Sequence, residues 1–129
     1  MSASPPVLLD SSYLIALERE TLSGELGPAR RFLPSLRGRS LVVSIVTVAE
    51  VLEGSRDEEA TMKSLGLLTI QGLHLTHSRR CALLQRRSAR RMGENDAWLV
   101  ATAEILGADV VGADRSAFER LGQRYLRFQ

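Results

Sequence analysis

The sequence predicts an α/β fold in which a central, mainly parallel sheet is covered by helices on both faces. Short apolar runs alternate along the chain with longer segments that carry helix start and stop signals. The first runs, at residues 7–9 and 41–43, are continuously apolar, as in strands buried on both faces of a parallel sheet. We therefore expect a three-layer α/β/α sandwich, with residues 1–129 as a single domain because no linker divides the chain.

These runs and segments predict one order of elements. Strands are expected at residues 7–9, 41–43, 67–70, 109–111 and, as an edge strand, 125–128. Helices are expected at residues 13–20, 29–36, 47–52, 57–65, 76–91, 96–106 and 116–121. A helical segment separates every two consecutive strands, which is the pattern of parallel strands joined by crossovers.

The helix boundaries in the first half of the chain rest on capping residues. Ser11 or Ser12 can cap the helix after the first strand. Gly38 marks the end of the second helix. Thr47 and Glu50 have the T-x-x-E spacing of a capping box, which predicts that the third helix starts at Thr47.

In the second half, glycines mark the boundaries. The segment 93–95 (Gly-Glu-Asn) interrupts the long helical pattern before it. A strongly apolar helix is then expected from Asp96 to Leu106, closed by Gly107. The next apolar run, at 109–111, is the fourth strand and ends just before Asp114.

Composition is typical of a globular protein that does not cross membranes. The chain has 129 residues, 44% of them hydrophobic, which suits one domain with a real core. No apolar run approaches the roughly 20 residues of a membrane-spanning helix, and no basic segment precedes an apolar one at the N-terminus. The single cysteine, Cys81, cannot form an internal disulfide, so a reducing cytoplasm is the expected compartment.

The basic residues are unusual in kind. Lys63 is the only lysine, so arginine supplies the rest of the 17 basic residues, although the net charge is only +2. The planar guanidinium suits phosphate recognition. A biased composition explains the same count equally well.

Four acidic residues lie beside apolar runs, where strands or helices should begin or end. Asp10 directly follows the first strand, Glu50 lies in the first turn of the helix after the second strand, and Asp114 lies just past the fourth strand. Ligands of open α/β sheets bind outside the carboxyl ends of the strands, so these three acids are expected to meet there. Asp96 is not placed by this reasoning, because its helix is expected to begin at the opposite edge of the sheet.

Gathered carboxylates repel one another, and a bound divalent cation is the usual compensation. Hard oxygen ligands select Mg²⁺ or Mn²⁺, which would lower the pKa of a bound water and favour hydrolysis of phosphate esters. Each acid also has a local explanation that stays open at this point. Glu50 can complete the capping box, Asp96 can favour the helix macrodipole, and Asp10 and Asp114 can form turns.

Four segments resemble, in residues and in order, the PIN-domain ribonucleases: L-L-D-S-S at 8–12, S-I-V-T-V-A-E at 44–50, G-E-N-D-A-W-L-V-A-T-A at 93–103 and V-V-G-A-D-R-S-A-F at 110–118. Their order and the chain length resemble the VapC toxins of bacterial toxin–antitoxin pairs. The resemblance spans nearly the whole chain. It implies a PIN-like fold in which Asp10, Glu50, Asp96 and Asp114 are the catalytic acids and the ligands of Mg²⁺ or Mn²⁺.

The resemblance implies further residues and partners. Ser12 matches a position that supports the first acid, and Thr47 matches a polar position before the second. Gly112 stands where the family usually has threonine, which puts one hydrogen bond to a metal ligand or water in question. The family also implies a homodimer, a cognate VapB-like antitoxin, and an endoribonuclease that hydrolyses RNA phosphodiester bonds with a metal-activated water.

Arginines near the middle of the chain are candidate RNA contacts. They fall within one arc if residues 79–91 form a single helix. The members of this arc are Arg79, Arg80, Arg86, Arg87, Arg90 and Arg91, and the candidates for RNA contact are Arg86, Arg87, Arg90 and Arg91. A solvated helix face, or a surface for an acidic antitoxin segment, explains the same arc.

The remaining aromatic and histidine residues have simpler interpretations. Tyr13 and Trp98 lie in apolar helical segments and are expected to pack in the core. His74 and His77 lack a cysteine or acidic partner at metal spacing and are expected at the surface or at a strand end. A metal-free ribonuclease with a histidine acid and base is therefore not expected.

Two alternatives to a nuclease remain. A response-regulator-like receiver or an aspartyl phosphatase would use Asp10 and a lysine near the late strands, but Lys63 lies mid-chain. A metal-binding PIN-fold module without nuclease activity would keep the acids for stability alone.

Overall fold

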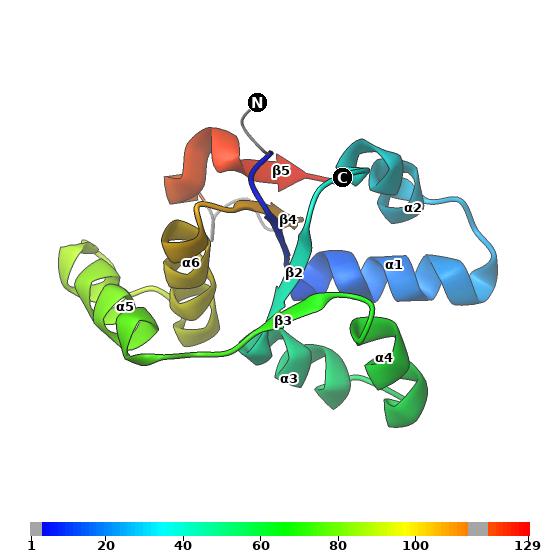
Figure 1. Cartoon of the computed structure of the whole chain (residues 1–129), viewed down its shortest axis with the longest axis horizontal. Coiled ribbons are helices and arrows are strands. Elements are labelled where there is room, and N and C mark those ends of the chain that lie inside the picture. The colour runs from blue at the N-terminus through cyan, green and yellow to red at the C-terminus, as the bar shows by residue number, and fades with distance from the viewer. Residues whose placement is uncertain (1–3, 114–118) are drawn as a thin grey trace.

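The computed structural model describes residues 4–113 and 119–129 and confirms the predicted α/β fold. A five-stranded sheet lies between helices on its two faces (Figure 1). The strands are β1 (Val7–Leu9), β2 (Leu41–Ser44), β3 (Thr69–Gln71), β4 (Asp109–Gly112) and β5 (Tyr125–Arg127). Their order is β3-β2-β1-β4-β5, and every neighbouring pair is parallel.

The helical layers account for the continuously apolar strands. The helices are α1 (Ser11–Ser23), α2 (Pro28–Phe32), α3 (Ile45–Glu53), α4 (Glu58–Leu65), α5 (Leu75–Arg87) and α6 (Glu94–Leu106), with 3₁₀ segments η1 (Leu33–Leu36) and η2 (Glu119–Arg124). Helices α5 and α6 lie on one side of the sheet, and α1 to α4 lie on the other (Figure 1). The helix predicted at 116–121 falls partly outside the described residues.

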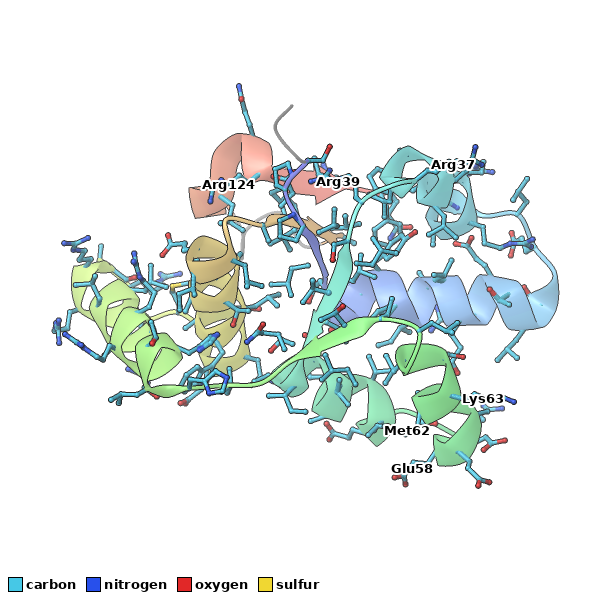
Figure 2. The ribbon with its side chains drawn as sticks, in the orientation of Figure 1. Arg37, Arg39, Glu58, Met62, Lys63 and Arg124 are labelled. Carbon is cyan, nitrogen blue, oxygen red and sulfur yellow. The ribbon has the colours of Figure 1, made fainter. Side chains whose placement is uncertain are left out.

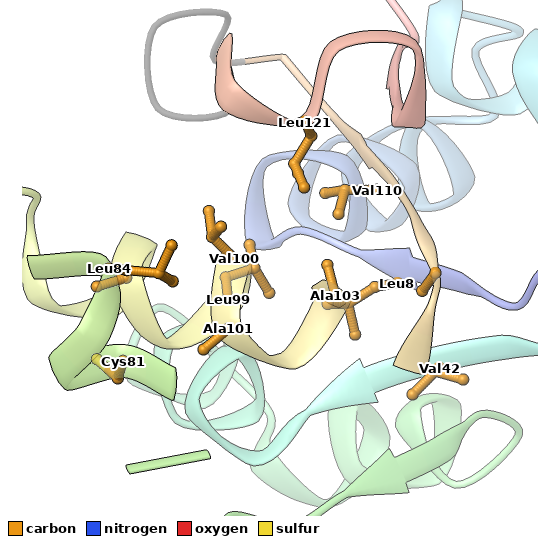
Figure 3. Close-up of a cluster of buried hydrophobic side chains, with 12 residues drawn as sticks. Leu8, Val42, Cys81, Leu84, Leu99, Val100, Ala101, Ala103, Val110 and Leu121 are labelled. Atoms are coloured by element: carbon orange, nitrogen blue, oxygen red, sulfur yellow. The ribbon is translucent and has the colours of Figure 1, made fainter. Parts of the chain in front are cut away.

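The central strand β1 is buried on both faces. Leu8 is in register with Val42 of β2 and Val110 of β4, and this row packs against α6 (Figure 3). Its neighbours Val7 and Leu9 point to the opposite face and pack with residues of α1. Because side chains alternate along a strand, one three-residue run contributes to both cores.

The start of α3 differs from the predicted capping box. The helix begins at Ile45, and its N-cap is Ser44, whose side-chain oxygen accepts a hydrogen bond from the backbone N–H of Val46 at 3.2 Å. Thr47 lies inside the first turn and is 1% exposed. The prediction was wrong because Ser44 ends a buried strand and can cap the helix at once, which leaves the β-branched Thr47 to pack in the core.

Helix α5 is shorter than predicted, so the arginine arc is not continuous. It ends at Arg87, and its C-cap Ser88 leaves the helical region with φ −83° and ψ 130°. The hydroxyl of Ser88 donates to the carbonyl oxygen of Leu84 at 2.6 Å. The side-chain amide of Gln85 forms hydrogen bonds of 2.9 and 3.0 Å with the backbone of Met92, which hold the segment after the helix in place. The two arginines at 90 and 91 therefore lie on the connection to α6.

One of the two histidines also differs from expectation. His77 is 3% exposed, on the buried side of α5, and its Nδ1 accepts a hydrogen bond from the backbone N–H of His74 at 3.1 Å. Burial and the charge of His74 both lower the pKa of His77. His74 is exposed, as expected. Tyr13 is fully buried, as predicted, and donates to the carbonyl oxygen of Ala29 at 2.9 Å.

Glu20 joins α1 to α2 through an internal cap. Its carboxylate accepts hydrogen bonds from the backbone N–H groups of Ala29 at 3.0 Å and Arg30 at 2.9 Å, which are among the unpaired donors at the start of α2. Gly27 allows this approach, because a Cβ there would lie 2.5 Å from the carboxyl carbon of Glu20. The loop between the two helices is thus tied to a buried charge.

Within residues 4–113 and 119–129, none of the helices is both long enough and apolar enough to cross a membrane.

We expect Glu20→Gln to destabilise the protein in a pH-dependent way. Burial acts to raise the pKa of Glu20, but backbone hydrogen bonds from residues 27, 29 and 30 and the charge of Arg31 lower it below its usual 4.5. The ionised group therefore contributes stability above pH 4.5 that is lost as the pH falls through the pKa of the folded state.

Urea unfolding from neutral pH to about pH 3 measures this contribution. The difference between wild type and Glu20→Gln should be largest near neutral pH and should shrink with acidification. Glu18→Gln, on the exposed side of α1, is the matched control. A difference that stays constant across this range would contradict the assignment.

Candidate functional site

The strand order creates a switch point at the centre of the sheet. From β1 the chain passes to β2 and β3 on one side, and then crosses to β4 and β5 on the other side. Connections therefore leave the carboxyl ends of β1 and β4 in opposite directions, which is where open α/β sheets bind ligands. Asp10, Ser44 and Gly112 lie at or directly after the carboxyl ends of β1, β2 and β4.

Asp10 is held at this edge by three hydrogen bonds. Its backbone N–H donates to the carbonyl oxygen of Val111 in β4 at 2.9 Å. Its Oδ1 accepts from the backbone N–H of Ser11 at 2.8 Å, and its Oδ2 accepts from the hydroxyl of Ser12 at 3.0 Å. Asp10 is thus the N-cap of α1, and only 8% of its surface is exposed. Strand pairing and the helix start together fix this carboxylate.

Ser12 links the carboxylate to the neighbouring strand. Its hydroxyl donates to Asp10 and accepts a hydrogen bond from the backbone N–H of Ala113 at 3.0 Å. Residue 12 therefore ties the first turn of α1 to the end of β4. The position singled out from sequence as a support of the first acid does contact that acid.

The glycine at 112 leaves room for this arrangement. A Cβ at this position would lie 2.9 Å from Oδ2 of Asp10, 3.1 Å from Cβ of Asp10 and 3.3 Å from Oγ of Ser12. A threonine at Gly112 would therefore require Asp10 to move. In this chain the hydroxyl beside the acid comes from Ser12.

Glu50 and Asp96 approach Asp10 from two helices. Glu50 is half-buried in α3, one turn after Thr47 on the same side of the helix. Asp96 is half-buried in the first turn of α6. The negative charges of both residues raise the pKa of Asp10, so the structure brings these three acids within electrostatic reach of one another.

The position of Asp96 corrects the expectation drawn from its helix. Helix α6 leads into β4, which starts at the amino edge of the sheet, so the helix must end at that edge. Its N-terminus therefore starts from the carboxyl edge, within electrostatic reach of Asp10. A helix antiparallel to the strands brings its first turn to the ligand-binding edge, and the opposite expectation was wrong.

Burial dominates the electrostatics of Asp10. Removal from water raises its pKa, the hydrogen bonds from Ser12 and Ser11 lower it, and the charges of Glu50 and Asp96 raise it again. The net result is a pKa of Asp10 above its ordinary value of 3.8. The buried carboxylate is thus poorly compensated by the described residues and has the character of a cation ligand.

The described residues alone do not complete a metal site. Within residues 4–113 and 119–129, no three side chains among His, Cys, Asp and Glu are gathered closely enough to hold one metal ion. Asp114 lies outside the described residues. Asp10, Glu50 and Asp96 supply only carboxylate oxygens, which are the ligands that a hard divalent cation prefers. Among the described residues, the main influences on the pKa of Asp10 include no cationic side chain.

The candidate RNA-contacting arginines are exposed and divided between two elements. Arg86 and Arg87 are at the end of α5, whereas Arg90 and Arg91 lie on the connection before α6. Arg80, on α5, pairs with Glu104 of α6 at 3.5 Å. The continuous ridge predicted from sequence is therefore not formed.

Ser44 was not among the site residues predicted from the sequence. This residue is fully buried at the end of β2 and starts the helix that carries Glu50. Its signal was present, because a serine directly after the apolar run 41–43 is a typical N-cap.

Comparison with known proteins identifies a family. A family model described as PIN domain matches residues 7–123. Among solved structures, a toxin–antitoxin complex from Klebsiella pneumoniae contains a chain that is 21% identical, with a TM-score of 0.77 and coverage of 99% of this chain and 98% of that one. FitAcB from Neisseria gonorrhoeae is 18% identical, with a TM-score of 0.70 and coverage of 95% and 96%.

A third similar structure is VapC20 from Mycobacterium tuberculosis, described as a toxin that cleaves the sarcin-ricin loop. It is 16% identical, with a TM-score of 0.65 and coverage of 90% of this chain and 95% of that one. No curated protein sequence matches the chain significantly. Likeness at these identities shows a shared fold.

We expect Asp10→Asn to stabilise the metal-free protein at neutral pH, raising the Tm by a few degrees. The substitution removes a buried charge that Glu50 and Asp96 repel. Because the pKa of Asp10 is raised on folding, the wild type gains relative stability as the pH falls from the folded pKa to the ordinary 3.8. The advantage of the variant should therefore shrink with acidification.

Thermal unfolding in EDTA at neutral and at acidic pH measures this effect. Asp57→Asn, at the exposed N-cap of α4, is a control that removes an acid which also caps a helix. Equal destabilisation by both variants at every pH would show that Asp10 acts only as a cap.

Proposed function

The chain belongs to the PIN-domain family, and we propose that it is an endoribonuclease dependent on Mg²⁺ or Mn²⁺ that serves as the toxin of a toxin–antitoxin pair. The observation that carries this proposal is the environment of Asp10. Its carboxylate is buried at the switch point of the sheet, and Glu50 and Asp96 raise its pKa further. Capping and the helix macrodipole account for single acids at helix starts but not for three acids gathered around one buried carboxylate, and this gathering is typical of a functional site.

We propose Asp10, Glu50, Asp96 and Asp114 as the catalytic acids that hold the metal. When bound, a divalent cation lowers the pKa of a water molecule and neutralises charge that develops on the phosphate. The chain itself contributes orientation. Ser11 and Ser12 hold both oxygens of Asp10, and Ser12 couples that carboxylate to Ala113, next to the fourth acid. Thr47 is proposed to support Glu50 from one turn earlier in α3.

RNA is the proposed substrate, and its phosphodiester bonds are hydrolysed. Arg86, Arg87, Arg90 and Arg91 are exposed on α5 and on the connection that enters α6. Exposed guanidinium groups suit phosphate contacts of the kind that position a backbone without reading its sequence. The similar VapC20 toxin, which cleaves the sarcin-ricin loop, agrees with this substrate class.

A VapB-like antitoxin is the proposed partner, because the similar structures include toxin–antitoxin complexes. A groove of about 610 Å³ between α1, the α2–η1 segment and β2 offers a matching surface. Five of the eleven described residues that line it are leucine, and the guanidinium of Arg30, among the described residues, donates only to the backbone carbonyl oxygen of Glu25. An apolar segment with acidic side chains would complement this groove. A homodimer in the cytoplasm remains part of the proposal.

One alternative keeps some support. A PIN-fold module without nuclease activity is favoured by Gly112, which replaces the threonine usual in the family. The receiver-like alternative has no such support, because Lys63 projects from α4 into solvent (Figure 2).

The nuclease proposal predicts metal-dependent RNA cleavage that needs the acids. Asp10→Asn, Glu50→Gln and Asp96→Asn should each lower the rate at least about 100-fold, the scale for removing one group that contributes to electrostatic stabilisation in an active site. Cleavage of total cellular RNA with Mg²⁺ or Mn²⁺, followed by mapping of the new ends, measures this loss. Circular dichroism checks that each variant is folded.

Glu53→Gln is the matched control for Glu50→Gln, because Glu53 lies one turn further along α3 and is exposed. It should leave cleavage unchanged. Full activity of the three acid variants, or of the wild type in excess EDTA, would sink the mechanism. A wild type that binds Mn²⁺ but cleaves no RNA would favour the module without nuclease activity.

The metal proposal has a second readout that does not depend on activity. Mg²⁺ or Mn²⁺ should raise the Tm of the wild type, because a ligand at about 100 times its Kd adds about 2.7 kcal/mol to stability. Asp10→Asn should lose most of this increase. Scanning calorimetry with KCl at equal ionic strength separates metal binding from screening, and equal shifts for both proteins would contradict the assigned ligand.

A further inference from the structure

One side of α1 extends from the candidate site to an exposed arginine. Ser12, Ile15, Ala16 and Arg19 follow the i, i+3, i+4, i+7 spacing of a single helical face. All four line a cavity of about 310 Å³, together with Ala113 and three further residues, Glu20, Glu25 and Gln129. The cavity therefore begins at the residue that holds the carboxylate of Asp10 and runs along α1.

The cavity joins the acidic site through two residues. Ser12 donates to Asp10 and accepts from the N–H of Ala113, so both residues that line this end of the cavity belong to the hydrogen-bond chain around the acid. A molecule whose phosphate lies at Asp10 can therefore reach the cavity without leaving the surface. This continuity favours an extension of the substrate itself as the occupant.

The walls combine an apolar surface with a cation. Ile15 is 40% exposed, so part of its apolar side chain is open to an occupant of the cavity. Arg19 is exposed and supplies positive charge. Of the two acids in the lining, Glu20 is turned toward the backbone N–H groups of Ala29 and Arg30, so its charge is already satisfied. Glu25 is exposed, where water screens its charge.

We propose that this cavity is a subsite for the nucleotide next to the scissile phosphodiester of single-stranded RNA. The base packs on Ile15 and Ala16, and the guanidinium of Arg19 binds the adjoining phosphate. This inference rests on the proposed ribonuclease function and adds a specific place for the substrate chain. Arg19 is a substrate-binding residue here and has no role in the chemical step.

The dimensions and chemistry fit a single nucleotide. A volume of about 310 Å³ is at the lower end of small-molecule sites, which span about 300–1,000 Å³. Splayed bases of single-stranded RNA pack on apolar side chains while cations contact the backbone. A paired helix keeps its bases stacked inside and has no base to insert.

The test measures binding in an Asp10→Asn background, which keeps the RNA intact. The probes are fluorescein-labelled decamers of uridine, cytidine or adenosine, followed by anisotropy at several NaCl concentrations. Arg19→Gln should weaken binding about fivefold, and the slope of log affinity against log salt should become shallower by about 0.7, as expected for the loss of one phosphate contact with a single strand.

Two further variants separate a binding role from a structural one. Ile15→Ala should weaken binding several-fold without changing the salt slope, because it removes only an apolar contact. Lys63→Gln removes one positive charge from the exposed surface of α4 and should change neither affinity nor slope (Figure 2). The unfolding midpoint of each variant should match that of the Asp10→Asn protein.

The outcomes distinguish this inference from the function on which it rests. If the wild type cleaves RNA with Mg²⁺ or Mn²⁺ but Arg19→Gln binds like Lys63→Gln, the subsite is wrong and the ribonuclease stands. If the wild type cleaves no RNA and none of the decamers binds, both proposals are overturned. A fivefold loss without a change of slope would also contradict the phosphate contact.

Discussion

The buried carboxylate of Asp10 is the constraint around which the rest of the site is arranged. It lies directly after the central strand, so the pairing of β1 with β4 and the first turn of α1 both determine its position. Ionisation at this place is costly, and Glu50 and Asp96 add to the cost through their charge. Other parts of the fold stabilise the chain, whereas burial and the neighbouring acids disfavour the ionised form of this group.

A serine and a glycine adapt the site to this constraint. Ser12 connects Asp10 with the end of β4, and Gly112 provides the space in which the carboxylate lies. The same helix that begins at Asp10 continues as the wall of the neighbouring cavity and ends in the loop that Glu20 holds. The single helix α1 therefore connects the acid, the proposed nucleotide subsite and the packing of α2.

Local patterns predicted the strands well but misplaced features that depend on competition between neighbours. Thr47 has the spacing of a capping box, but Ser44 is the N-cap of α3 because its side-chain oxygen accepts a hydrogen bond from the backbone N–H of Val46. The helical periodicity of the arginines continues past residue 87, but hydrogen bonds of Ser88 and Gln85 stop the helix there. In both cases a nearby side chain offered the backbone a better partner than the pattern suggested.

By itself the sequence determined the parallel α/β fold and the acids that follow two of its strands, because continuous apolar runs and helix caps are local properties. Its four motifs also indicated the PIN-domain family. Local patterns did not place Asp96 with Asp10, because its position depends on which edge α6 leaves and where β4 sits in the sheet. The family resemblance implied this grouping, and the tertiary structure brings the two acids within electrostatic reach. It also decided that Gly112 makes room for the acid, because the distance between neighbouring strand ends cannot be derived from either strand alone.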